Sequence, residues 1–271
     1  MADVSPQSQS KSQSSTTEVP WMIRLEDVCK TFRGGKDQVL KGVSLDFPKG
    51  QLTYILGSSG AGKSVILKHI LGLLRPDQGK IWVDGQDLTQ MTARDLPALR
   101  VKFGMLFQNS ALFDGMTVYE NVAFPLFEHT HLKESEIREK VKKTLATLGM
   151  TSGLDKLPNE LSGGMKKRVG LARAIIREPS ILLYDEPTTG LDPLTRTTVD
   201  ELISNLKQEL RLTSLVISHD IPSALLLADM IAFLHQGKIV FVGTPEELKS
   251  SEVPIIRDFL QAERRSVSAL S

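Results

Sequence analysis

Eight consecutive residues carry the clearest chemical signal in this sequence, because residues 57–64 match the phosphate-binding pattern G-x-x-x-x-G-K-[ST]. The glycines let the backbone curl so that its N–H groups point toward a polyphosphate. A helix that begins near Gly62 adds its positive end. Lys63 would reach the β- and γ-phosphates, and the Ser64 hydroxyl would hold Mg²⁺. The pattern predicts a nucleotide site made of Gly57, Ser58, Ser59, Gly60, Ala61, Gly62, Lys63, Ser64 and Val65.

Two further stretches carry candidate chemistry. Ser162, Gly163 and Gly164 precede a predicted helix, where a hydroxyl, two unhindered backbone N–H groups and a helix N-terminus would bind an anion. An ordinary helix cap by Ser162 explains the same tripeptide. Residues 181–186 form a short apolar run that ends in two carboxylates, which is typical of a buried parallel strand.

Alternating strands and helices must position these groups. The apolar run 52–56 precedes the phosphate loop and a helical run 65–74 follows it, a context that a flexible Gly/Ser linker would not have. Strands at 21–32 and 39–47 are predicted to form a hairpin beside the strand at 52–56. Further strands are predicted at 80–83, 102–107, 181–185, 213–218, 230–234 and 238–242. Further helices are predicted at 94–100, 117–127, 133–148, 161–177, 195–210 and 222–228.

The composition excludes several classes of protein. Lys and Arg number 33 against 32 Asp and Glu, so the charge balance gives no reason to expect a nucleic-acid-coating protein. A single cysteine, Cys29, rules out an internal disulfide framework and fits a reducing cytosol. No stretch reaches the roughly 18 apolar residues of a membrane span, so a membrane role would need a partner. Residues 1–20 are rich in Ser, Gln and Thr, carry no secretory signal and are expected to form a disordered tail.

Taken in order, the motifs resemble those of the ATP-binding subunits of ABC transporters over residues 23–248. The matching residues are the signature Leu161–Gly164, the Walker B strand Ile181–Asp185, the catalytic carboxylate Glu186, the D-loop Gly190–Asp192, the Q-loop Gln108, the switch His219 and the adenine-stacking Phe32. The resemblance implies an α/β P-loop NTPase of the ABC ATPase type. It would have a RecA-like core, an antiparallel β subdomain and a helical subdomain at about 109–178, all within an ATPase domain of residues 21–250.

The resemblance also implies a role for each site residue. Glu186 would orient or deprotonate the attacking water, and His219 would contact the γ-phosphate of ATP and help hold that water. The implied metal ligands for Mg²⁺ are Ser64, Gln108 and Asp185. The implied catalytic residues are Glu186, His219, Lys63 and Gln108.

One chain would hold only half of each site. In the family, Ser162, Gly163 and Gly164 of one subunit cap the ATP that is bound at Lys63 of the other. This implies a head-to-tail homodimer with two buried ATP molecules. Asp192 would lie along that interface, and it is also expected to cap the helix after Pro193.

Some departures from the family pattern point to one of its branches. Most signatures end in Gln or Glu where this chain has Met165, and Phe32 replaces the usual Tyr. Met165 and the stretches 105–113, 121–126 and 128–130 resemble importer-type ATPases that pair with MCE-domain proteins, including the ATPase of the Mla phospholipid transport system. The implied partners are two permease subunits in the inner membrane, an MCE-domain lipid-binding protein and a small STAS-type regulatory protein, with no nucleic acid. The chain would sit peripherally on the cytoplasmic face of that membrane.

Two apolar clusters have alternative interpretations. Residues after Gln108 would line the groove for a permease coupling helix, with an apolar floor formed by Phe107, Leu112, Phe113 and Met116. Alternatively, these side chains pack the helical subdomain. In the C-terminal extension 251–271, helical spacing puts one apolar stripe on Ile255, Ile256, Phe259 and Leu260. That stripe either packs on its own subunit or reaches the twin subunit.

Three functions follow from these patterns. The first is an ATPase that powers phospholipid transport across the bacterial envelope. The second is an importer ATPase for another solute, against which only Met165 and the stretch 108–113 argue. The third is a soluble ABC-type ATPase of DNA repair or translation. Such proteins usually carry two cassettes or a long coiled-coil insertion, and neither is visible in this sequence.

Overall fold

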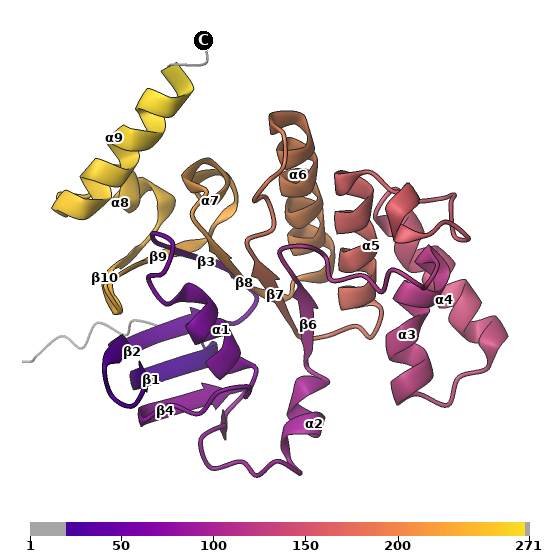
Figure 1. Ribbon diagram of the computed structural model, residues 1–271, viewed down its shortest axis with the longest axis horizontal. Coiled ribbons are helices and arrows are strands. Elements are labelled where there is room, and N and C mark those ends of the chain that lie inside the picture. Colours follow the sequence, from indigo (N-terminus) through magenta and orange to yellow (C-terminus); the bar gives the residue numbers. More distant parts are fainter. Residues whose placement is uncertain (1–19, 269–271) are drawn as a thin grey trace, which may run out of the picture.

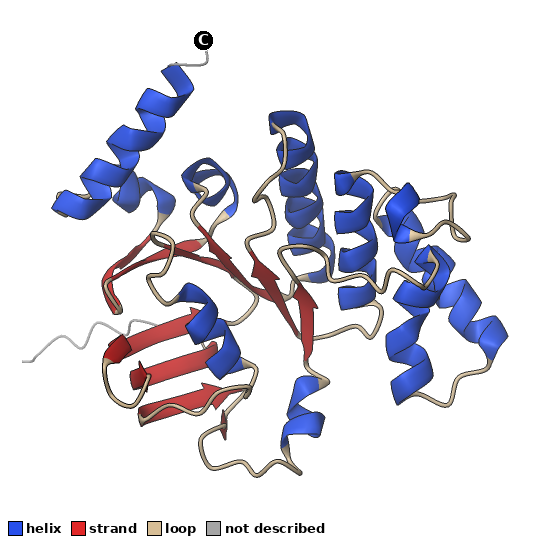
Figure 2. Cartoon of the chain, viewed as in Figure 1, coloured by secondary structure: helices blue, strands red, loops and turns tan. Residues whose placement is uncertain are grey.

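The computed structural model describes residues 20–268, with side chains to residue 262, so the expected N-terminal tail lies almost wholly outside the described residues. Its strands form two separate sheets (Figures 1 and 2). The smaller sheet has the order β2-β1-β4-β5 and its neighbours are all antiparallel. Its strands are β1 (Trp21–Phe32), β2 (Asp37–Pro48), β4 (Gln78–Val83) and β5 (Gln86–Asp87).

The larger sheet positions the site. Its order is β10-β9-β3-β8-β7-β6, and all neighbours are parallel except the edge strand β10. Its strands are β3 (Leu52–Leu56), β6 (Phe103–Leu106), β7 (Ile181–Asp185), β8 (Thr213–Ser218), β9 (Met230–His235) and β10 (Lys238–Gly243). Leu56 lies opposite Ser218, and Asp185 lies opposite Ile217. The segments that follow β3, β7 and β8 therefore meet at one edge, where parallel sheets usually bind ligands.

The hairpin of β1 and β2 does not lie beside β3 as the hydrophobic pattern predicts, because β8 and β9 already occupy both edges of β3. The hairpin instead packs over a shared apolar core. That core contains Val28 and Leu45 from the hairpin, Ile66 and Ile70 from α1 (Lys63–Ile70), and Ile55 from β3.

Most of the remaining helices cover the opposite face of the larger sheet (Figure 1). Tyr54 of β3 faces their core, whereas its neighbour Ile55 faces the core around α1, as the two-residue period of a strand requires. None of the described helices has both the length and the apolar composition of a membrane span. Besides α1, the helical elements of the described chain are α2 (Leu96–Arg100), which packs on the core around α1, α3 (Val118–His129), α4 (Glu134–Thr147), a 3₁₀ turn (Pro158–Glu160), α5 (Gly163–Ile175), α6 (Pro193–Leu210), α7 (Ile221–Leu227), α8 (Pro245–Lys249) and α9 (Pro254–Ser268).

The apolar stripe of α9 packs on its own subunit. Ile256 is buried in the core above the larger sheet, and Ile255, Phe259 and Leu260 pack against that core. The ring of Phe259 meets the ring of Phe233 in β9 edge-on, with 5.2 Å between the centroids. Of the two arrangements that the sequence left open, the structure shows the contact within the subunit.

Candidate functional site

The predicted phosphate loop connects β3 to the start of α1. Gly62 caps α1 with a φ of 110°, which an L side chain rarely adopts. A Cβ on Gly57 would lie 2.3 Å from the backbone oxygen of Leu234 in β9, so only glycine fits there. Ser58, Ser59, Gly60 and Ser64 are exposed, whereas Gly57, Ala61, Gly62 and Lys63 are buried and Val65 is half-buried. The loop thus presents polar groups and backbone to solvent at the head of a helix.

Lys63 joins this loop to the end of β7. Its Nζ atom donates hydrogen bonds to the carbonyl oxygens of Gly57 (2.7 Å) and Ser58 (3.2 Å). The same atom lies 3.4 Å from Oε1 of Glu186, and only 6% of the Lys63 side chain is exposed. A single ammonium group thus links the phosphate loop to a carboxylate from a segment more than 100 residues away.

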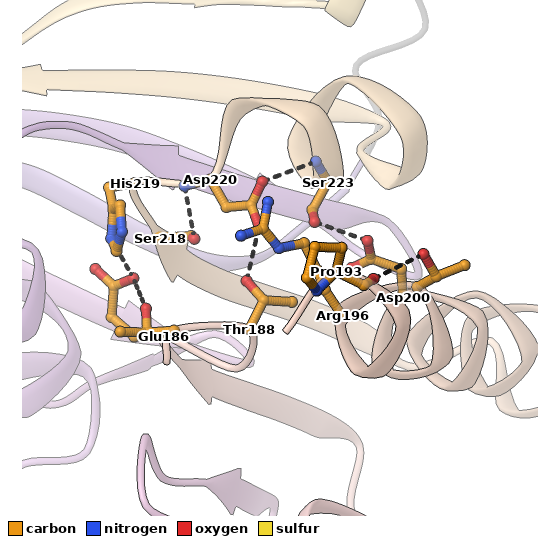
Figure 3. Close-up of polar contacts among 11 residues, drawn as sticks. Glu186, Thr188, Pro193, Arg196, Asp200, Ser218, His219, Asp220 and Ser223 are labelled. Carbon is orange, nitrogen blue, oxygen red and sulfur yellow. Dashed lines mark hydrogen bonds and ion pairs between the residues drawn. The ribbon is translucent and has the colours of Figure 1, made fainter. Parts of the chain in front are cut away.

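Glu186 also contacts His219, which follows β8 (Figure 3). Nδ1 of the His219 ring lies 2.8 Å from Oε2 of Glu186, and the Thr189 hydroxyl donates to the same oxygen at 3.0 Å. Because a carboxylate accepts hydrogen bonds, the imidazole donates its Nδ1 hydrogen. The backbone N–H of Glu186 donates to the Ile217 oxygen at 2.9 Å, and its φ of 47° is unusual for a residue other than glycine. A carboxylate, an imidazole and an ammonium group are thus held together beside a phosphate loop.

Asp185 lies at the end of β7 beside this group. Burial raises the pKa of its carboxyl above the usual value, and the adjacent Glu186 raises it further. Lys63, Lys68 and Lys167 act in the opposite direction. Burial and Glu186 therefore disfavour the charged form of the Asp185 carboxyl, which a nearby cation would favour.

The predicted signature lies apart from the phosphate loop. The Ser162 hydroxyl caps α5 by accepting from the backbone N–H of Met165 at 3.3 Å. A Cβ on Gly164 would lie 3.2 Å from Cγ2 of Thr195, and Gly163 packs near Leu191. Among the described residues, no hydrogen bond or ion pair joins residues 162–164 to residues 57–64.

Asp192 caps α6, as the sequence predicts. Its carboxylate accepts the backbone N–H of Thr195 at 3.0 Å and the Thr195 hydroxyl at 2.5 Å. These hydrogen bonds lower the pKa of Asp192 below its usual value. The residue that precedes α6 is therefore exposed and charged, and its geometry is set by the helix start.

Phe32 and Gln108 lie outside the cluster of Lys63, Glu186 and His219. Phe32 ends β1, and Nζ of Lys30 lies 5.8 Å from the centre of its ring. Gln108 is exposed in the loop after β6, and its backbone oxygen accepts a hydrogen bond from Nζ of Lys167 in α5. Burial lowers the pKa of Lys167 to about 8. The buried Lys167 thus ties the loop at Gln108 to α5.

A sequence model described as ABC transporter matches residues 40–189, more than half of the chain. The chain belongs to the ABC transporter family. It is 42% identical to the probable ribonucleotide transport ATP-binding protein mkl of Mycobacterium leprae over 242 residues, which cover 89% of this chain and 69% of the relative. It is also 42% identical to the intermembrane phospholipid transport system ATP-binding protein MlaF of Haemophilus influenzae over 233 residues, covering 86% and 88%.

The solved structures agree with this assignment. The dimeric ATP-binding cassette MJ0796, bound to ADP and phosphate in a post-hydrolysis state, has a TM-score of 0.75 and 31% identity. The match covers 83% of this chain and 99% of that one. The predicted fold class is confirmed. The chain is an ABC ATPase that binds and hydrolyses ATP.

Several polar residues around the ABC ATPase site were not predicted from the sequence. Each contacts a predicted residue or lies beside one in the chain, but side-chain pairing across loops leaves no periodic signal. Thr188 and Thr189 lie two and three residues after the predicted Glu186, and this proximity was the available hint. The residues are Lys167, Thr188, Thr189, Arg196 and Asp220.

Proposed function

We propose that this chain is the ATP-hydrolysing subunit of a transporter that moves phospholipid across the bacterial envelope. The 42% identity to an intermembrane phospholipid transport protein, with 88% of that relative covered, carries the proposal. The mycobacterial relative named for ribonucleotide transport is equally similar, but the match covers only 69% of its length. Ribonucleotide transport is therefore the second candidate. The branch-specific resemblance at Met165 and residues 105–113 favours phospholipid.

Within this function, the ATPase domain spans residues 21–250 and Phe32 stacks on adenine. Lys63 exchanges the carbonyl oxygens of Gly57 and Ser58 for phosphate oxygens when ATP binds. Glu186 then orients the attacking water and accepts its proton, while His219 holds the Glu186 carboxylate in place and contacts the γ-phosphate.

We assign a Mg²⁺ site to a hydroxyl, an amide oxygen and a carboxylate, which are the hard oxygen donors that this ion prefers. The raised pKa of Asp185 fits this assignment, because a cation beside the carboxylate would lower it. Bound Mg²⁺ supplies positive charge to the phosphate oxygens. The ligands are Ser64, Gln108 and Asp185.

The active form is a head-to-tail homodimer. Residues 162–164 have no polar contact with the phosphate loop of their own subunit within the described part of the chain. In the dimer, Ser162, Gly163 and Gly164 would cap the nucleotide held at Lys63 of the other subunit, and Asp192 would line the interface. The dimeric state of the related cassette MJ0796 supports this arrangement.

A groove of about 990 Å³ between α2, α3 and α5 fits a membrane partner. Phe107 and Phe113, both exposed, line it as the sequence predicts. Leu112 and Met116 are not among its lining residues, and Leu112 instead packs against the apolar core. We assign the groove to an apolar helix of a permease subunit that presents an acidic side chain. The arginines that would meet that side chain are Arg100, Arg173 and Arg177.

With one groove on each protomer, the homodimer would dock two permease subunits at the cytoplasmic face of the inner membrane. An MCE-domain lipid-binding protein and a small STAS-type regulatory protein complete the proposed complex. Residues 251–271 form an extension of the ATPase domain.

The test is a mild-detergent pull-down of the tagged chain from native membranes, with mass spectrometry of proteins and lipids. Recovery of a permease, an MCE-domain protein and phospholipid is expected. Phe113→Asp should abolish permease recovery, whereas Leu226→Asp, at a residue 73% exposed on α7, should not. Recovery of a ribonucleotide permease would move the cargo to the second candidate. Ribosomes or DNA-repair proteins without a permease would overturn a transport function.

A further inference from the structure

A buried polar network lies next to the Glu186–His219 pair, and the carboxylate of Asp220 is at its centre (Figure 3). Oδ2 of Asp220 accepts the Thr188 hydroxyl at 2.9 Å and lies 3.5 Å from Nε of Arg196. Oδ1 accepts the backbone N–H of Ser223 at 3.2 Å and so caps α7. Only 8% of the Asp220 side chain is exposed. A carboxylate this deeply buried needs such partners, because an unpaired one would be strongly destabilising.

Each partner of Asp220 belongs to a segment that carries a site residue. Thr188 lies two residues after Glu186, in the turn that leaves β7. Arg196 lies in the first turns of α6, four residues after Asp192. Asp220 itself directly follows His219. One carboxylate therefore joins three segments that are distant in the sequence.

The backbone at Glu186 gives this connection a mechanical consequence. A positive φ at a residue with a side chain is strained, and it persists only where the surrounding structure holds it. The turn after Glu186 is held by the Thr188–Asp220 hydrogen bond, in addition to the backbone bond from Glu186 to Ile217. Loss of the Thr188 bond would remove one of the restraints that fix the Glu186 turn relative to the His219 loop.

We propose that Asp220 is a positioning residue for ATP hydrolysis, which acts through Thr188 to fix the Glu186 turn against the His219 loop and the start of α6. It does not touch the reacting atoms. A catalytic carboxylate needs placement within about half an ångström, so a small displacement is sufficient to reduce turnover.

The same network contains a matched control. The Ser223 hydroxyl donates to Oδ2 of Asp200 in α6 at 2.8 Å. Like Thr188, Ser223 is buried and its hydroxyl bonds to a buried carboxylate. Unlike the Thr188 hydroxyl, the Ser223 hydroxyl bonds to Asp200 and not to Asp220, so its removal leaves the bond between Thr188 and Asp220 in place. Removal of either hydroxyl should therefore lower stability by a similar amount. Only the Thr188 hydroxyl connects Asp220 to the turn that follows Glu186.

The experiment compares Thr188→Val, Thr188→Ser and Ser223→Ala in the purified full chain. Thr188→Val keeps the shape of the side chain but removes the hydroxyl. We expect its kcat to fall about tenfold or more with KM for ATP unchanged. Thr188→Ser restores the hydroxyl and should restore most of kcat. Ser223→Ala should keep kcat within about twofold, while its melting temperature falls as much as that of Thr188→Val.

A second readout requires neither nucleotide nor turnover. The ¹⁵N chemical shift of Nδ1 in His219 reports its hydrogen bond to Glu186, and the signal is assigned by its loss in His219→Gln. The shift should change in Thr188→Val and stay unchanged in Ser223→Ala. A Thr188→Val enzyme with wild-type kcat and an unchanged His219 signal would overturn the proposal. Equal losses of kcat in Thr188→Val and Ser223→Ala would also overturn it, because they would indicate a general structural role.

Discussion

Asp200 on α6 should make the stability of this protein depend on pH. Its side chain is 7% exposed, and burial raises the pKa of its carboxyl to about 6. The hydrogen bond from Ser223 and the charge of Arg196 act against burial, whereas Asp220 raises the pKa further. One of its oxygens, Oδ1, has no hydrogen-bond partner. The folded state therefore favours the protonated form of Asp200 more strongly than the unfolded state does.

The sign and the size of the effect follow from linkage. An unfolded Asp has a pKa near about 3.9, so the folded state binds the proton more tightly. The stabilisation is complete below about pH 3.9 and is lost as the pH rises through about 6. The total loss in the free energy of unfolding is about 3 kcal/mol. About 1 kcal/mol of it has already occurred at about pH 4.5, which leaves about 2 kcal/mol between pH 4.5 and 8.

Asp200→Asn removes this dependence because the amide has the same shape, keeps an acceptor for Ser223 and cannot ionise. Urea unfolding of both proteins at pH 4.5 and pH 8 measures the difference in their free energies of unfolding. Relative to the unchanged chain, the free energy of unfolding of Asp200→Asn should be about 2 kcal/mol higher at pH 8 than at pH 4.5. For Glu201→Gln, at an exposed carboxylate one residue along the same helix, the corresponding change should be less than about 0.5 kcal/mol. A difference for Asp200→Asn that stays constant with pH would refute the reasoning.

Three further outcomes are expected. Gly57→Ala should destabilise the protein by about 2 kcal/mol and weaken ATP binding in a nucleotide titration, because its Cβ would lie 2.3 Å from the Leu234 oxygen; normal stability would contradict that close approach. Glu186→Gln should lower the ATPase rate at least about 100-fold while ATP binding persists, with ATP-bound dimer seen by gel filtration; unchanged turnover would remove Glu186 from the mechanism. Phe259→Ala should lower the free energy of unfolding by about 1–2 kcal/mol through loss of the Phe233 contact, and no change in a denaturant titration would mean that α9 does not stabilise its own subunit.

The features that the sequence predicted correctly are local. The strand, loop and helix around Gly57–Ser64, and the strand that ends at Asp185, depend on spacing within about 20 residues and on glycines with positive φ. The capping roles of Ser162 and Asp192 are also local, because each caps the helix that directly follows it. The ABC ATPase fold was predicted from the resemblance of the motifs to those of the family. The catalytic and metal-binding roles of the individual residues stay predictions.

Only the tertiary structure decided what depends on contacts between distant segments. Strand pairing placed the hairpin in its own sheet, because β8 and β9 occupy both edges of β3. Packing turned Phe113 into the groove and Leu112 into the core. The convergence of Thr188, Arg196 and Asp220 follows from parallel strands that end at one edge of a sheet. Neither hydrophobic periodicity nor motif spacing encodes such contacts, because they arise only when the sheet has formed.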